Sequence, residues 1–283
     1  FSSIPDIASI PSSFSEKSYY SSNSKREDFI LQKSVINKIN DFCTKQKVSI
    51  FNFFMAVYSI YISRVSNLDE VIIGTPILNR TNFKEKNTCG MFISNVPLKI
   101  CVDNNLSFAD FVSNIAKDSL SMLRHQKYPY QYLLENLREQ NTIMSNLYDN
   151  MISYQITKAN DGSIDIPHDV HWTGANHISC GINIHFHDNN DSGNLIVSYD
   201  YLVDKYSAVD IKDTHNRILT IINQILESDN ILLNQIEIVT PDEKNTILNA
   251  FNNRTLNYPK NKAIIELFEE QVKKYPNNIA VVS

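Results

Sequence analysis

Two histidines and an aspartate lie close together in H-F-H-D at residues 185–188, in a stretch that alternates as a strand. Imidazole and carboxylate groups bind zinc and act as general acids and bases. A zinc site needs three or four convergent ligands, and the nearby His168, His171 and His177 lie in a stretch without any periodicity. Hydrogen-bonded or solvated histidines on the polar face of a strand are the better interpretation, and we expect no metal site.

His125 is another candidate for proton transfer by residue type. It follows a predicted helix, where a cationic ring also interacts favourably with the helix dipole, so we assign it no catalytic role. The sequence contains no G-x-S-x-G, P-loop or G-x-G-x-x-G motif, so no motif predicts a hydrolase or a nucleotide-binding enzyme.

The remaining polar candidates lie in residues 71–102. An apolar run, V-I-I, is stopped by Gly74 and Pro76, and a polar loop follows from Arg80 to Gly90. Residues 92–102 then alternate as a second strand, in which Pro97 predicts either an edge position or a bulge because proline cannot donate to the ladder. An arginine at a strand exit is by itself usually a surface residue. A strand, a charged loop and an irregular strand are typical of the wall of a site.

The elements around this wall are read from apolar periodicity. Strands are expected at 25–31, 151–156, 178–186 and 195–201, and helices at 35–43, 50–61, 107–124, 129–137, 207–225 and 264–272, with a further helix starting at 240–243. Ser49, Ser107 and Ser207 are in position to cap three of the helices. The helix at 50–61 is apolar on all sides and should be the buried central one. The irregular alternation predicts an α/β fold with a mixed sheet packed by helices.

Composition narrows the class of protein. The 283 residues are 42% hydrophobic and 20% charged, with a formal net charge of −5, which argues against a nucleic-acid surface. No apolar run approaches the ~20 residues that span a bilayer. The four cysteines form no C-x-x-C pair and should be reduced thiols of a cytoplasmic protein. The N-terminal residues lack the cationic start of a signal peptide, so we expect none. Because the sequence does not begin with methionine, we expect it to be a segment of a longer chain.

Five segments carry a resemblance to a known family. G-T-P-I-L-N-R at 74–80 and G-M-F-I-S-N-V-P-L-K at 90–99 are similar to the G-x-P-x-x-x-R and G-x-F-V-N-T-x-P-x-R elements of condensation domains in nonribosomal peptide synthetases. R-H-Q-K-Y-P-Y at 124–130 resembles their H-Q-x-Y-P-F element. The sequence after Thr240 resembles the linker that follows such domains, and 264–282 resembles the opening of an adenylation domain.

The family's catalytic H-H-x-x-x-D-G is absent, since no two histidines are adjacent. The resemblance therefore implies the C-terminal half of a condensation domain, with no catalytic residue in this chain and no activity alone. It implies residues 1–239 as this lobe, 240–260 as a linker and 261–283 as a truncated adenylation domain. The implied fold is the chloramphenicol-acetyltransferase-like sandwich lobe, with a mixed, mostly antiparallel sheet.

The resemblance also implies site residues. Arg80 is expected to pair with the aspartate of the absent catalytic loop and to be solvated when that loop is missing. The tunnel-lining candidates are Gly90, Met91, Phe92, Ser94 and Asn95, where Ser94-Asn95 replaces the usual Asn-Thr. His171 and Trp172 are candidates for a latch, within residues 157–176, that crosses to the partner lobe.

Parent condensation domains join a donor acyl or peptidyl thioester to the amine of an aminoacyl thioester. The implied partners are the N-terminal lobe, the donor and acceptor carrier proteins and the downstream adenylation domain, with neither nucleic acid nor membrane. No cofactor is expected on this chain, because phosphopantetheine is attached to the carrier proteins. Two alternatives remain: a lobe of a free-standing, coenzyme A-dependent acyltransferase, and a non-catalytic docking module.

Overall fold

The computed structural model describes residues 6–14, 21–140, 146–156, 173–174, 176–188, 193–228, 230–251, 253 and 261–279. The chain divides into two units, Phe1–Thr240 and Pro241–Ser283. The first unit carries the sheet and the core, and every buried apolar side chain among the described residues lies at or before Ile236.

Six strands of the described residues form one sheet in the order β1-β6-β5-β4-β2-β3. Their bounds are Ser24–Leu31 (β1), Glu70–Ile77 (β2), Ser94–Cys101 (β3), Asn150–Ile156 (β4), Ile182–Asp188 (β5) and Leu195–Leu202 (β6). β4 runs parallel to both β2 and β5, and the other neighbours are antiparallel. The predicted α/β fold with a mixed, mostly antiparallel sheet is confirmed.

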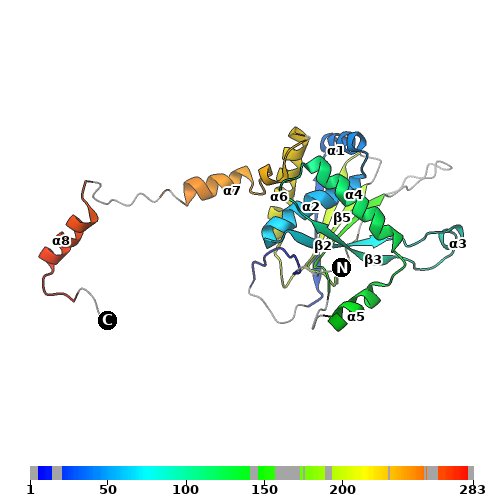
Figure 1. The fold of residues 1–283 in the computed structure, drawn as a ribbon, viewed down its shortest axis with the longest axis horizontal. Coiled ribbons are helices and arrows are strands. Elements are labelled where there is room, and N and C mark those ends of the chain that lie inside the picture. Colours follow the sequence, from blue (N-terminus) through cyan, green and yellow to red (C-terminus); the bar gives the residue numbers. More distant parts are fainter. Residues whose placement is uncertain are drawn as a thin grey trace. The chain divides into compact units, whose positions relative to one another are not determined.

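Four helices pack into the larger core with one face of the sheet: α1 (Lys33–Gln46), α2 (Ile50–Ser66), α4 (Phe108–Arg124) and α6 (Ala208–Glu227) (Figure 1). The prediction for α2 is confirmed, because its residues from Asn52 to Ser63 are all buried. Its cap is also as predicted, since the Ser49 hydroxyl accepts a hydrogen bond from the Asn52 amide at 3.1 Å. α2 therefore lies in the centre of the core.

The opposite face of the sheet is covered near β2 by α5 (Tyr130–Gln140). Leu134 and Leu137 of α5 form a second apolar cluster with Ile72 of β2 and with Tyr148, whose ring lies close to Gly74. The helices α4 and α5 thus bracket the β2–β3 hairpin from its two faces.

Three strand boundaries differ from the prediction. β2 does not stop at Gly74 and Pro76 but continues through both to Ile77, because this stretch stays paired with β3. The strand expected from residue 178 begins only at Ile182, because the amide of Ile178 donates to Ser22 O at 2.9 Å and that of Gly181 to Asp149 Oδ1 at 2.8 Å. The strand expected from residue 92 begins at Ser94. Pro97 is at an edge as predicted, since β3 is the last strand of the sheet.

The second unit contains α7 (Pro241–Asn245), a π-helical turn at Thr246–Ala250 and α8 (Ile264–Lys274). Both predicted helix positions are confirmed. α8 exposes an apolar face, with Ile264 at 84%, Ile265 at 67% and Phe268 at 63% exposure. The sequence I-A-V-V at 279–282 predicts the start of a further strand, which lies almost wholly outside the described residues.

Among the described residues, no single helix has both the length and the apolar character needed to cross a membrane. α1 and α2 pass that test only as a pair, and the pair is bent by 102° at its break.

Candidate functional site

The loop between β2 and β3, residues 78–93, is folded rather than extended. It carries a short helix, α3 (Phe83–Lys86), at the tip that projects from the end of the two strands (Figure 1). The side chain of Asn82 caps α3 by accepting a hydrogen bond from the Glu85 amide at 2.9 Å. The Thr88 hydroxyl donates to Lys84 O at 2.6 Å and closes the end of the turn.

The side chain of Arg80 binds backbone carbonyls of this loop. Its guanidinium donates to the backbone carbonyls of Glu85, Thr88 (2.7 Å) and Gly90 (2.8 Å) and lies 4.1 Å over the ring of Phe92. Carbonyls at the end of a short helix have no partner further along the helix, and the fork of an arginine satisfies several at once. The expectation that Arg80 is solvated in this chain is therefore wrong. Its pairing with a carboxylate from another lobe remains a prediction.

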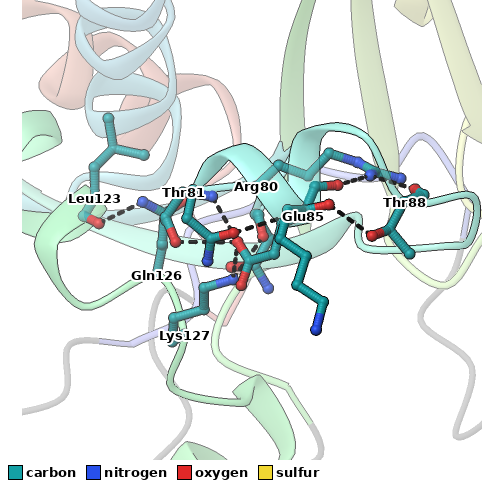
Figure 2. Close-up of polar contacts among 10 residues, drawn as sticks. Arg80, Thr81, Glu85, Thr88, Leu123, Gln126 and Lys127 are labelled. Carbon is teal, nitrogen blue, oxygen red and sulfur yellow. Dashed lines mark hydrogen bonds and ion pairs between the residues drawn. The ribbon is translucent and has the colours of Figure 1, made fainter.

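A second polar contact joins this loop to the turn after α4 (Figure 2). The Glu85 carboxylate accepts hydrogen bonds from the Thr81 amide at 2.7 Å and the Thr81 hydroxyl at 3.0 Å, and lies 2.9 Å from Lys127 Nζ. Lys127 Nζ also donates to Asn79 O at 2.8 Å. The hydrogen bond from the Thr81 amide, together with that from Lys127, lowers the pKa of Glu85 to about 2.

Sequence reasoning missed both partners of this contact. The spacing N-x-x-E in residues 82–85 is that of a helix cap followed by an acid and could have identified Glu85 as a residue that folds back on its own turn. Lys127 lies in the H-Q-K-Y-P-Y segment, which was noticed only for its resemblance. Nothing in the local pattern pairs it with Glu85.

A groove of about 500 Å³ runs beside the edge strand β3, between α4 and α5. Its lining combines apolar and polar side chains: Asn95, Val96, Pro97, Leu98 and Lys99 of β3, Asp118, Ser121 and Met122 of α4, and His125, Tyr128, Tyr130 and Leu133 beyond it. Burial raises the pKa of Asp118 above its usual range. The groove thus combines apolar surface with hydrogen-bonding groups and with the charged side chains of Lys99 and Asp118.

The predicted tunnel residues divide between the groove and the loop. Asn95 lines the groove. Phe92 lies under Arg80, Gly90 offers its carbonyl to Arg80 at a φ of +148°, and Met91 is 92% exposed. Ser94, at the start of β3, is half-buried. Their role in a tunnel remains a prediction.

The latch candidates His171 and Trp172 lie outside the described residues. So does nearly all of the predicted latch, residues 157–176, apart from 173–174 and 176.

The histidines of β5 belong to a polar cluster on the sheet. Asp200 of β6 accepts two hydrogen bonds from Arg26, both at 2.7 Å, and lies 3.3 Å from His185 Nε2. The other ring nitrogen of His185 lies 2.7 Å from the Ser153 hydroxyl. Burial alone would raise the pKa of Asp200, but its bonds with His185 and Arg26 lower it.

Serine, histidine and aspartate are the residue types of a nucleophilic triad, but their placement indicates a structural network. Ser153 is only 4% exposed within β4, and Arg26 occupies both oxygens of Asp200. For His185, the prediction of a hydrogen-bonded histidine on a strand is confirmed. The described residues contain no group of three or more His, Cys, Asp or Glu that could hold a metal ion.

Comparison with known proteins identifies the family of this chain. Residues 2–248 match the family described as Condensation domain. Surfactin synthase subunit 1 of Bacillus subtilis (strain 168) is 31% identical over 285 residues, a stretch that covers 100% of this chain and 8% of that relative. The chain therefore spans less than a tenth of this curated relative.

Solved structures share the fold. A four-domain nonribosomal peptide synthetase bound to AMP and glycine superposes with a TM-score of 0.77 at 14% identity, over 99% of this chain and 22% of that one. The condensation domain of the Monacolin K polyketide synthase MokA gives a TM-score of 0.66 at 16% identity, over 80% of this chain and 55% of that one. This chain belongs to the condensation-domain family of nonribosomal peptide synthetases and has its chloramphenicol-acetyltransferase-like fold.

Proposed function

We propose that this chain is the C-terminal half of a condensation domain, followed by the linker and first residues of an adenylation domain. The parent domain forms an amide bond by attack of the amine of one carrier-bound aminoacyl thioester on the carbonyl of another carrier-bound acyl or peptidyl thioester. This half supplies one wall of the site and no catalytic base. The thiol leaves on its own carrier protein as the amide forms.

One observation carries this proposal. Three family motif segments, 74–80, 90–99 and 124–130, meet around the β2–β3 loop and the groove beside β3, while the adjacent-histidine motif is missing from all 283 residues. The coverage of the MokA condensation domain, 55% of its length, supports a half-domain. Holding two tethered reactants in register is a credible source of rate for amide formation, because it removes the entropy cost of their encounter.

Arg80 and the latch are assigned roles between the two lobes. Arg80 pairs with the aspartate of the catalytic loop on the N-terminal lobe, as in the family pattern. In this chain three of the five N–H donors of the guanidinium are bound to carbonyls of its own loop, so the aspartate would bind the remaining donors. His171 and Trp172 belong to the segment that crosses to that lobe.

The partners follow from the same proposal. They are the N-terminal lobe, a donor and an acceptor carrier protein and the adenylation domain downstream, within a cytoplasmic synthetase. The phosphopantetheine arms belong to the carrier proteins. The groove beside β3, with Asn95 and Tyr128 among its apolar side chains, fits a slender arm that carries amides.

The test is a condensation assay with two carrier proteins, one loaded with an acyl group and one with an amino acid. We expect the chain alone to give the background rate and the complete domain to give amide product. A complete domain with its histidine motif changed to alanine is the control. Turnover by the chain alone would overturn the half-domain assignment, and an inactive complete domain would indicate a docking module instead.

A further inference from the structure

Lys127 is the residue through which the β2–β3 loop is held to the rest of the first unit. Among the contacts that the structure gives for residues 78–93, the polar ones that reach beyond the hairpin both come from Lys127 Nζ, to Asn79 O at 2.8 Å and to Glu85 Oε2 at 2.9 Å. Figure 2 shows the Lys127 side chain extending to the Glu85 carboxylate from the turn after α4. One cation therefore bridges the start of the loop and its helix.

Glu85 connects this bridge to Arg80. Its carboxylate binds Lys127 and both the amide and hydroxyl of Thr81, while its backbone carbonyl accepts a hydrogen bond from Arg80. Glu85 therefore contacts both Lys127, through its carboxylate, and Arg80, through its carbonyl, so we expect a shift of Lys127 to move the part of the loop that Arg80 binds. Phe92, stacked on Arg80, lies at the far end of that loop and leads directly into β3.

Lys127 also lies between two residues of the groove wall. His125 and Tyr128, in the same turn, line the groove, as does Asn95 just after the loop. The turn is closed by a hydrogen bond from the Tyr128 amide to His125 O at 3.0 Å. The turn after α4 lines the groove, whereas the β2–β3 loop adjoins it through β3, whose residues from Asn95 onward line it. Lys127 joins that turn to the loop.

We propose that Lys127 and Glu85 are positioning residues, which hold the β2–β3 loop against the turn after α4 and so fix the groove wall that receives the carrier-bound substrates. The proposal rests on the function proposed above. The side chains of Lys127 and Glu85 are 48% and 23% exposed, and an exposed ion pair contributes little to global stability. Its effect is therefore expected on the geometry of the loop rather than on folding.

The first arm of the test uses this chain and does not depend on its activity. Lys127→Met should make the amides of residues 79–92 exchange with deuterium about tenfold faster, with the midpoint of denaturant unfolding unchanged, since the loop opens locally. Lys127→Arg keeps the cation and should restore slow exchange. Lys117→Met is the matched control, because Lys117 is an exposed lysine of α4 that does not line the groove and whose hydrogen bond, to Asn114 Oδ1 at 3.4 Å, stays within its own helix.

The second arm measures condensation by the complete domain. Lys127→Met should raise KM for the loaded carrier proteins about tenfold with kcat within about twofold, as for a misplaced binding wall. Lys127→Arg and Lys117→Met should behave as the wild type. Added salt should raise KM of the wild type more than that of Lys127→Met, since salt screens an exposed pair.

The outcomes separate the two proposals. Unchanged loop exchange in Lys127→Met overturns the tether itself. Faster exchange with unchanged KM, in an active domain, overturns the positioning role. A wild-type domain that forms no amide overturns the proposed function, and the exchange arm then still shows whether the tether exists.

Discussion

At the scale of single residues, polar side chains of this protein act mainly by satisfying backbone groups that secondary structure leaves open. Arg80 does this for three carbonyls of the β2–β3 loop. Arg64 does it at the end of α2, where its guanidinium donates to the carbonyls of Leu233 and Ile236. An arginine is well suited to this role because its donors are arranged in a rigid, planar fork.

We predict that Arg80→Ala destabilises this chain by about 1–2 kcal/mol, since a typical hydrogen bond contributes roughly 1 kcal/mol net. Arg80→Lys should lie between the wild type and alanine, because an ammonium group cannot reproduce the fork. In the complete condensation domain the loss should be larger, roughly 3–5 kcal/mol, if Arg80 also pairs across the lobes. Denaturant unfolding of both proteins measures the difference. Equal losses would mean that Arg80 serves only its own loop.

His215 provides a prediction for pH. It is 5% exposed in α6, stacked 4.1 Å from Phe29, with its Nδ1 3.0 Å from the Tyr199 hydroxyl. Burial lowers its pKa from 6.5 to about 4. Between pH 6.5 and pH 4, His215 is therefore protonated in the unfolded chain but stays neutral in the folded chain. The contribution of His215 to the free energy of unfolding is fully present above pH ~6.5 and is lost as the pH falls toward 4. The loss attributable to His215 should reach about 3 kcal/mol.

The measurement is the free energy of unfolding at several pH values from 7 to 4, for the wild type and for His215→Gln. Glutamine retains an acceptor for Tyr199 but does not titrate in this range. The difference between the two proteins isolates His215 from other groups, including His187, whose burial also lowers its pKa to about 4. Parallel curves for the two proteins would contradict the prediction.

At the scale of elements, apolar periodicity and caps were sufficient to predict the long helices, but not the four-residue α3 within the predicted polar loop. α2 is buried from Asn52 to Ser63 because it has almost no polar side, and α4 begins after its cap Ser107. Pro97 restricted β3 to an edge position or a bulge, and β3 is an edge strand. These features depend on residues that are neighbours in sequence, so a local pattern determines them.

Features that depend on distant residues could not be predicted in this way. The start of β5 is displaced to Ile182 because Asp149 binds the Gly181 amide. The tether between Glu85 and Lys127, and the insertion of β4 between β2 and β5, likewise depend on tertiary packing. For the candidate site, the motif segments were recognised from the sequence, but the groove and the contacts of Arg80 required the structure.

Gly74 of β2 tests the packing between the sheet and its second apolar cluster. A Cβ at this position would lie 2.4 Å from Tyr148 Cε2 and 2.8 Å from Met151 Cγ. We predict that Gly74→Ala costs about 1–3 kcal/mol by overpacking. Tyr148→Leu removes the nearest ring atoms, so the double variant should lose less than the sum of the two single losses. Denaturant unfolding of the four proteins measures this coupling, and simple additivity would contradict it.

At the scale of the whole molecule, the described core belongs to the first unit alone. Its apolar side chains extend from Ala8 to Ile236, and its single sheet places the groove of about 500 Å³ at one edge, beside β3. The second unit begins at Pro241 and has no buried apolar side chain among its described residues. A helix with an exposed apolar face usually has a partner surface, which for α8 is, in our proposal, the adenylation domain.

We therefore predict that a chain ending at Thr240 retains the stability of the full chain within about 0.5 kcal/mol, as for changes outside a core. Denaturant unfolding of the two chains measures this, with a chain ending before η1 (Leu233–Gln235) as the control that should unfold readily, because Leu233 and Ile236 are core residues. In the full chain, the amides of α8 should exchange quickly, since an isolated helix of this length is marginal in water. In a longer synthetase that includes the adenylation domain, the same amides should become protected as Phe268 and Ile264 are buried. Slow exchange of α8 in the 283-residue chain as a monomer would show that residues 261–283 fold on the first unit, and their assignment to another domain would have to be abandoned.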